Sequence, residues 1–343
     1  MGKCVFADGT VIEDYKRPYI VAEVNSSHGG DVKIAEKMIE AAAAAGCNGV
    51  KFQSFTTESL YSKVYYQKNP IVKRLVKKFS LSASELALLA GYSKEKCISF
   101  SSTPYSKDEV DFLVNDCHAP YVKISSMELN NPTFLAYIAK TGSSIVLSTG
   151  MGTIDEIKNA VQTLEENGGK QIVLLHCVSN YPAKVEDVNL NNIILLRENF
   201  PKYPIGFSDH TEGDEAAIAA VALGAAFIEK HLTLDKSKIG MDNNMATEPE
   251  AMAELIRKCR QVQLALGSIE RIVSTKELEQ RKTMRRSLVA ARNLSKGSVL
   301  TFGDFSAKRP GDGISPDKID ILVGKKLIRD IDEDMQILPN DVE

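Results

Sequence analysis

Two lysines interrupt short apolar runs that have the composition of buried β-strands. Lys51 lies within residues 49–53 and Lys123 within residues 121–125. A lone ammonium group buried away from water is costly, so each lysine must face either a buried carboxylate or an anionic ligand. Two lysines in the same setting favour an anionic ligand. A structural salt bridge is the alternative for each.

Hydroxyl side chains lie at or just beyond the ends of other runs of this kind. They are Thr103, Ser126, Ser148 and Ser208. Hydroxyl donors beside two ammonium groups suit a small molecule that bears both phosphate and carboxylate.

His210 and His231 follow two apolar runs that are neighbours in the sequence. We expect their imidazoles to converge on one divalent cation, with other positions left open for water and substrate oxygen, as a Lewis-acid site requires. A core or surface histidine is the alternative for each. His176 is either a third ligand or a packing residue, and we favour packing. Glu229 is expected to orient His231.

Three carboxylates, Glu23, Glu128 and Asp242, are the hydrogen-bond acceptors that we expect to meet the hydroxyl groups of a polyol. For each of the three, the alternative interpretation is an ordinary carboxylate on the protein surface.

The elements that carry these residues alternate between apolar, β-branched segments and helical patterns through residue 267, which is typical of parallel strands joined by helical crossovers. The sequence predicts strands at residues 19–24, 49–53, 98–102, 121–125, 144–149, 171–177, 204–208 and 227–231. Helices are predicted at residues 32–45, 132–140, 153–167, 214–223 and 248–266. Thr153 with Glu156 fits a capping box.

Eight such units over about 250 residues are typical of an α/β fold of the (β/α)₈ TIM-barrel type, whose active site lies at the carboxyl ends of the strands. A doubly wound open sheet is the alternative. It normally has a glycine-rich phosphate-binding turn after its first strand, and residues 25–30 lack that spacing.

Beyond the barrel the sequence changes to short strands and turns. We expect a catalytic domain over residues 1–280 and a small β-rich domain over residues 281–343. A domain of that size has little hydrophobic core of its own, so we expect it to be stabilised by packing against the barrel or against another subunit.

Composition excludes several classes of function. The chain of 343 residues is 43% hydrophobic and 25% charged, with a net charge of −3 and no polybasic segment, so we expect no nucleic-acid partner. No run approaches the roughly 18 apolar residues of a membrane span, so we expect no membrane partner and a cytoplasmic protein. The six cysteines are scattered without a C-x-x-C motif and are expected to be reduced.

The residues around these positions resemble the sialic acid synthases, the family that makes N-acetylneuraminate and other nonulosonic acids. The matching barrel segments are residues 23–30, 50–53, 101–104, 121–124, 147–151, 174–177, 206–211 and 228–231. Residues 286–288 and 308–313 resemble the C-terminal antifreeze-like (SAF) domain of that family.

The resemblance implies a transferase of the N-acetylneuraminate synthase type, with Glu23, Lys51, Lys123 and Glu128 as catalytic residues. It implies that phosphoenolpyruvate is bound by Lys51, Thr103, Lys123, Ser126, Ser148 and Ser208. It implies sugar contacts from Glu23, Gln53, Glu128, Tyr181, Asp242 and Arg309. It also implies a divalent metal on His210 and His231, Mn²⁺ first with Mg²⁺ or Co²⁺ as alternatives, and a domain-swapped homodimer in which Arg309 comes from the partner.

Two loops depart from the family pattern. Ser27 precedes His28 where the family usually has asparagine, and Met241 precedes Asp242 where it often has proline. Both loops are expected to touch the sugar, so the acceptor stays open between N-acetylmannosamine and the 2,4-diacetamido-trideoxy hexoses of legionaminic and pseudaminic acid synthesis. A synthase of octulosonate or heptulosonate phosphates and a non-catalytic carbohydrate-binding protein are the wider alternatives.

Overall fold

Eight parallel strands form one sheet, with the strand order β5-β4-β3-β10-β9-β8-β7-β6. The computed structural model describes residues 1–238 and 240–343. The strands are β3 (Tyr19–Glu23), β4 (Gly49–Gln53), β5 (Ser99–Thr103), β6 (Val122–Ile124), β7 (Ile145–Ser148), β8 (Ile172–Cys177), β9 (Ile205–Asp209) and β10 (Phe227–His231). The predicted eight-stranded parallel barrel is confirmed.

The two ends of this strand order, β5 and β6, meet to close the barrel. Among the described residues no backbone ladder joins these two strands. Instead the Ser101 hydroxyl donates to the Tyr121 carbonyl at 3.1 Å. A side chain therefore makes a hydrogen bond where the other neighbouring strands use backbone groups.

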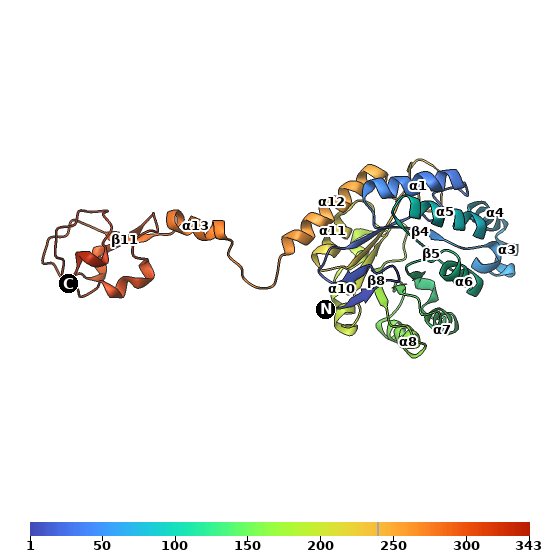
Figure 1. The fold of residues 1–343 in the computed structure, drawn as a ribbon, viewed down its shortest axis with the longest axis horizontal. Coiled ribbons are helices and arrows are strands. Elements are labelled where there is room, and N and C mark those ends of the chain that lie inside the picture. The colour runs from blue at the N-terminus through green and yellow to red at the C-terminus, as the bar shows by residue number, and fades with distance from the viewer. Residues whose placement is uncertain (239) are drawn as a thin grey trace. The chain divides into compact units, whose positions relative to one another are not determined.

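Helices surround the strands of the barrel unit (Figure 1). They are α1 (Val32–Ala45), α5 (Ala83–Glu95), α6 (Lys107–Asn115), α7 (Pro132–Lys140), α8 (Ile154–Glu166), α10 (Asn191–Asn199), α11 (Glu215–Ala222) and α12 (Pro249–Leu266). The capping box predicted at Thr153 and Glu156 is confirmed, and α1 ends at Gly46, whose φ of 88° is accessible to glycine at little cost.

Other helices of the barrel unit were not predicted from the sequence. They are α5, α6 and α10, together with α2 (Thr57–Leu60), α3 (Lys63–Lys68) and α4 (Pro70–Phe79), which lie between β4 and α5, and α9 (Val185–Val188), which follows β8.

An N-terminal hairpin packs against the amino-terminal ends of the barrel strands. Its strands are β1 (Lys3–Val5) and β2 (Val11–Glu13). Phe6 stacks against Tyr121 with ring centroids 4.7 Å apart, and Tyr19 stacks against Phe227 at 5.4 Å. Because side chains alternate along a strand, the positions that bring Tyr19 and Phe227 inward at this end bring Glu23 and His231 inward at the other.

Asp14 ties this hairpin to the barrel although it is fully buried. Its carboxylate accepts hydrogen bonds from the backbone of Ile205 at 2.9 Å and Gly2 at 3.1 Å, and from Arg197 Nε at 3.3 Å. These three donors offset the cost of burying the charge.

The chain divides into two compact units, Met1–Gly267 and Ser268–Glu343. The second unit contains α13 (Thr275–Met284) and an antiparallel pair, β11 (Ser287–Ala290) with β12 (Phe305–Lys308). Its small core is Leu288, Ala290, Leu294, Leu300, Ile314, Leu322, Leu327, Ile331 and Ile337. No helix among the described residues has the length and apolarity required to cross a membrane.

We expect Asp14→Ala to lower the free energy of unfolding by about 3–5 kcal/mol, because it leaves the Arg197 guanidinium and two backbone N–H groups without their acceptor. Urea denaturation followed by circular dichroism measures the change. The neighbouring Glu13→Ala removes only a surface pair with Lys3 at 3.8 Å and should cost less than about 1 kcal/mol. Equal losses in the two variants would contradict the role assigned to Asp14.

Candidate active site

A cavity of about 380 Å³ opens at the carboxyl ends of the barrel strands. Its lining brings together residues from all eight barrel strands, β3 to β10, and from the loops that follow the strands. The residues are Glu23, Asn25, Lys51, Gln53, Phe55, Leu60, Tyr61, Thr103, Tyr105, Lys123, Ser125, Ser126, Met127, Ser148, Met151, Cys177, Ser179, Tyr181, Ser208, His210, Glu229, His231, Met241 and Asp242. The two lysines, four hydroxyl residues and two histidines selected from the sequence therefore surround one space.

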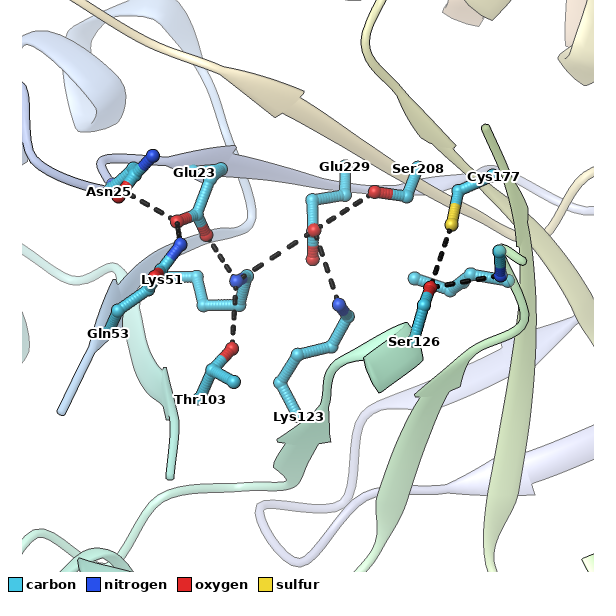
Figure 2. Close-up of polar contacts among 12 residues, drawn as sticks. Glu23, Asn25, Lys51, Gln53, Thr103, Lys123, Ser126, Cys177, Ser208 and Glu229 are labelled. Carbon is cyan, nitrogen blue, oxygen red and sulfur yellow. Dashed lines mark hydrogen bonds and ion pairs between the residues drawn. The ribbon is translucent and has the colours of Figure 1, made fainter. Parts of the chain in front are cut away.

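A buried row of alternating charges crosses the base of this cavity, as Figure 2 shows. Lys51 forms an ion pair with Glu23 and lies 3.8 Å from Glu229 Oε1, which is 3.3 Å from Lys123 Nζ. Thr103 accepts a hydrogen bond from Lys51 at 3.1 Å, and Ser208 donates to Glu229 at 3.1 Å. The lysines thus have the carboxylate partners of the salt-bridge interpretation and also line a cavity, where the anionic ligand stays a prediction.

The two ammonium groups are not equally compensated. Burial would lower the pKa of Lys51, but the carboxylates of Glu229 and Glu23 outweigh burial and raise it. Burial dominates at Lys123 and lowers its pKa, because Glu229 is the carboxylate within ion-pair distance. Lys123 therefore has more to gain from a bound anion.

Glu229 has a different position from the one expected. Its carboxylate lies between the two lysines, which lower its pKa against the opposing effect of burial. Among the described residues its Oε2 atom is buried without a hydrogen-bond partner, and so is Ser125 Oγ, which also lines the cavity. Buried polar atoms normally have partners, so these two mark positions for water or a ligand.

The two histidines lie side by side above this row, with ring centroids 5.3 Å apart. His210 Nδ1 is 2.7 Å from the Val178 carbonyl, which can only accept, so Nδ1 carries the proton and Nε2 keeps a free lone pair. Burial lowers the pKa of both imidazoles, which keeps them neutral, as a metal ligand must be.

These residues fit a divalent cation with few protein ligands. Across residues 1–238 and 240–343 no cluster of three or more histidine, cysteine or acidic side chains has metal-binding geometry. Asp242 Oδ2 is 3.6 Å from His231 Nδ1, which suits an orienting partner. Two imidazoles would leave most coordination positions to water and substrate oxygen.

His176 has a structural role, as favoured from the sequence. Its Nε2 atom is 2.6 Å from the Val188 carbonyl, and its ring stacks on Phe207 with centroids 5.7 Å apart. His176 therefore meets the backbone and a neighbouring strand rather than the other two histidines.

The residues expected to contact a sugar do not all reach the cavity. Glu23, Gln53, Tyr181 and Asp242 line it, and Gln53 donates to Glu23 at 3.1 Å. Glu128 is not among the lining residues, and its Oε2 accepts from Asn131 at 2.8 Å. Arg309 belongs to the second unit, so its contact with a sugar stays a prediction.

One polar corner of the cavity was not recognised from the sequence. Ser126 Oγ accepts from the Gly150 amide at 2.9 Å and lies 3.2 Å from Cys177 Sγ. A Cβ atom at Gly150 would come within 2.5 Å of Ser179 Oγ and 2.8 Å of Cys177 Sγ. Only glycine fits there, and the glycine that directly follows Ser148-Thr149 was the available signal.

Comparison with known proteins finds a matching family for each of the two units. The NeuB family matches residues 38–271, and the SAF domain matches residues 285–343. The N,N'-diacetyllegionaminic acid synthase of Campylobacter jejuni is 38% identical over 93% of this chain and 98% of its own length. The human N-acetylneuraminate-9-phosphate synthase is 33% identical over 93% of this chain and 91% of its own.

A solved structure shares the fold. The crystal structure of the N-acetylneuraminic acid synthetase of Leptospira borgpetersenii in complex with citrate superposes with a TM-score of 0.76 at 32% identity. It covers 81% of this chain and 96% of the other.

We expect Glu229→Gln to bind inorganic phosphate at least about tenfold more tightly than the unchanged protein. A carboxylate about 5 Å from a bound anion opposes it by roughly 3 kcal/mol at an effective dielectric constant near 20, and the amide does not. Isothermal titration calorimetry without metal measures the affinity. Glu128→Gln, outside the lining, should leave it unchanged, and weaker binding by Glu229→Gln would show that the carboxylate is needed to hold the lysines in place.

Proposed function

The chain belongs to the NeuB family and is a nonulosonic acid synthase, and we propose that it condenses phosphoenolpyruvate with a 2,4-diacetamido-trideoxy hexose. The observation that carries the proposal is the pair of buried ammonium groups at the base of one cavity, with two neutral imidazoles beside them. Phosphoenolpyruvate has a phosphate and a carboxylate that two such ammonium groups would neutralise.

The lining of the cavity supports the choice of acceptor. Lys51 and Lys123 are the two cations among its described lining residues, and both lie at the base, so this lining offers no third cation to a sugar phosphate. Phe55, Leu60 and Met241 offer apolar surface suited to the methyl groups of a deoxygenated, doubly acetylated sugar. The similarity to the Campylobacter legionaminic acid synthase points the same way.

The proposed reaction forms one carbon–carbon bond and breaks one carbon–oxygen bond. Carbon 3 of phosphoenolpyruvate bonds to the aldehyde carbon of the acceptor, whose oxygen gains a proton. Water then bonds to carbon 2 and loses one proton, and inorganic phosphate leaves with the other proton as its bond to carbon 2 breaks and the oxygen from water becomes the keto group.

The residues of the cavity have distinct roles in this proposed reaction. Lys51 and Lys123 offset the negative charge of phosphate and carboxylate at every stage. Burial raises the pKa of Glu23 despite the opposing effect of Lys51, so Glu23 holds a proton more readily than a surface carboxylate does. We assign to it the proton that the aldehyde oxygen gains.

We propose that His210 and His231 hold a divalent cation, Mn²⁺ first. When bound, the cation would polarise the aldehyde carbonyl as a Lewis acid. A domain-swapped homodimer that brings Arg309 of one subunit to the other, and a cytoplasmic location, are part of the same proposal and rest on the family resemblance.

A panel of acceptors tests the substrate assignment. With phosphoenolpyruvate and Mn²⁺, we expect a nine-carbon product by mass spectrometry, with equimolar phosphate release, from a 2,4-diacetamido-trideoxy hexose. N-acetylmannosamine should react at least about tenfold more slowly, since it has only one acetamido group and no C6 methyl to pack against Phe55, Leu60 and Met241. Preferred use of N-acetylmannosamine or its phosphate would refute the acceptor, and no phosphate release from any sugar would support a carbohydrate-binding protein instead.

Removal of the cation tests the metal assignment. Chelation should reduce turnover by a factor of about 100 or more, with recovery on addition of Mn²⁺, because no protein group replaces a lost Lewis acid. His210→Ala should lose the recovery, whereas His176→Asn, which keeps a polar side chain away from the site, should retain it. Full turnover of His210→Ala in chelated buffer would refute the assignment.

A further inference from the structure

A second buried ion pair lies directly behind the two histidines. Asp209 ends β9 and Lys230 is the penultimate residue of β10, and the two are register partners in the sheet. Lys230 Nζ is 2.7 Å from Asp209 Oδ2, and the side chains are 1% and 0% exposed. Neither residue lines the cavity.

The same pair fixes the turn that follows β9. Lys230 Nζ also donates to the Thr211 carbonyl at 2.7 Å. Asp209 Oδ1 accepts from the Thr211 amide at 2.9 Å and from its hydroxyl at 2.8 Å. Asp209, Thr211 and Lys230 thus form one hydrogen-bonded group, which we call the brace.

The brace consists of residues that are next to the candidate metal ligands in the chain. His210 lies between Asp209 and Thr211 in the chain, and Lys230 directly precedes His231. Because successive side chains of a strand point to opposite faces, the brace side chains point away from the barrel interior while the imidazoles point into it. Any change in the distance between the ends of β9 and β10 would therefore move one imidazole relative to the other.

Stability alone does not account for such a pair. Burying two charges costs several kcal/mol before their attraction is counted, and apolar replacements of similar volume are often neutral or stabilising. A group held by four defined contacts does, however, fix geometry within narrow limits. Two imidazoles can share one cation only if their separation is fixed in this way, because both ligand nitrogens must lie about 2.1 Å from the cation.

We infer that the brace of Asp209, Lys230 and Thr211 positions His210 and His231 so that both bind one divalent cation. This inference rests on the metal assignment in the proposed function. Its residues are positioning residues, because they act through the imidazoles and touch neither substrate nor cation.

The test is the affinity for Mn²⁺ alone, measured without substrate by the electron paramagnetic resonance signal of the free ion. We expect the double variant Asp209→Asn with Lys230→Met to bind Mn²⁺ about 10–100-fold more weakly than the unchanged protein. Removing both charges together avoids leaving one buried and unpaired.

A matched control separates positioning from stability. The double variant Asp14→Asn with Arg197→Met removes the ion pair at the opposite end of the barrel and should keep the affinity for Mn²⁺ within about twofold. If the brace double variant does not fold, Thr211→Val removes only the hydroxyl bond to Asp209 and should weaken Mn²⁺ binding about fivefold, as expected for one lost hydrogen bond.

Two outcomes overturn the inference and are distinguishable from each other. A folded brace variant whose affinity for Mn²⁺ stays within about twofold of the unchanged protein shows that the pair serves the fold alone. If the unchanged protein binds no Mn²⁺, or His210→Ala binds it equally well, the metal assignment fails and the inference fails with it.

Discussion

The candidate site depends on one arrangement, the buried row in which carboxylates and ammonium groups alternate. Two lysines cannot stay charged at the base of a barrel without compensation, and Glu229 supplies it to both of them at 3.8 and 3.3 Å. The compensation is incomplete, because burial still lowers the pKa of Lys123. The row therefore compensates both lysines and still favours an anion beside Lys123, and the hydroxyl groups and imidazoles around the cavity are placed to contact the same anion or its partner.

Strand periodicity allowed much of this site to be predicted from the sequence. It placed Lys51, Lys123 and the strand-end hydroxyl groups on the inner face, since alternate residues share a face and parallel strands end together. It could not identify the neighbour that a long side chain meets, so Glu229 was assigned to His231 instead of the lysines. Nor could it place Glu128, which follows the strand on a short helical turn, Ser126–Glu128, and accepts a hydrogen bond from Asn131, so its contact with a sugar stays a prediction.

The barrel was easier to predict from the sequence than the short helices inserted between its strands and main helices. The eight strands have strong apolar patterns, and α1, α7 and α8 begin at clear side-chain caps, whereas α2 and α9 are each four residues long, too short for a helical period to show. That α2–α4 segment matters to the site, because Leu60 and Tyr61 from it line the cavity. Part of the surface that we propose to meet the acceptor therefore comes from a segment whose structure depends on tertiary packing.

The aromatic packing at the amino-terminal end of the barrel has a kinetic consequence. Phe6, Tyr19, Tyr121 and Phe227 fill that end, so molecules enter and leave the cavity only past exposed residues such as Tyr181 at the opposite end. The lysines are 2% and 3% exposed and lie at the deepest place of the cavity. With phosphoenolpyruvate bound at the lysines, as we propose, a sugar that entered first would block its path, so the order of binding would be a property of the barrel's shape.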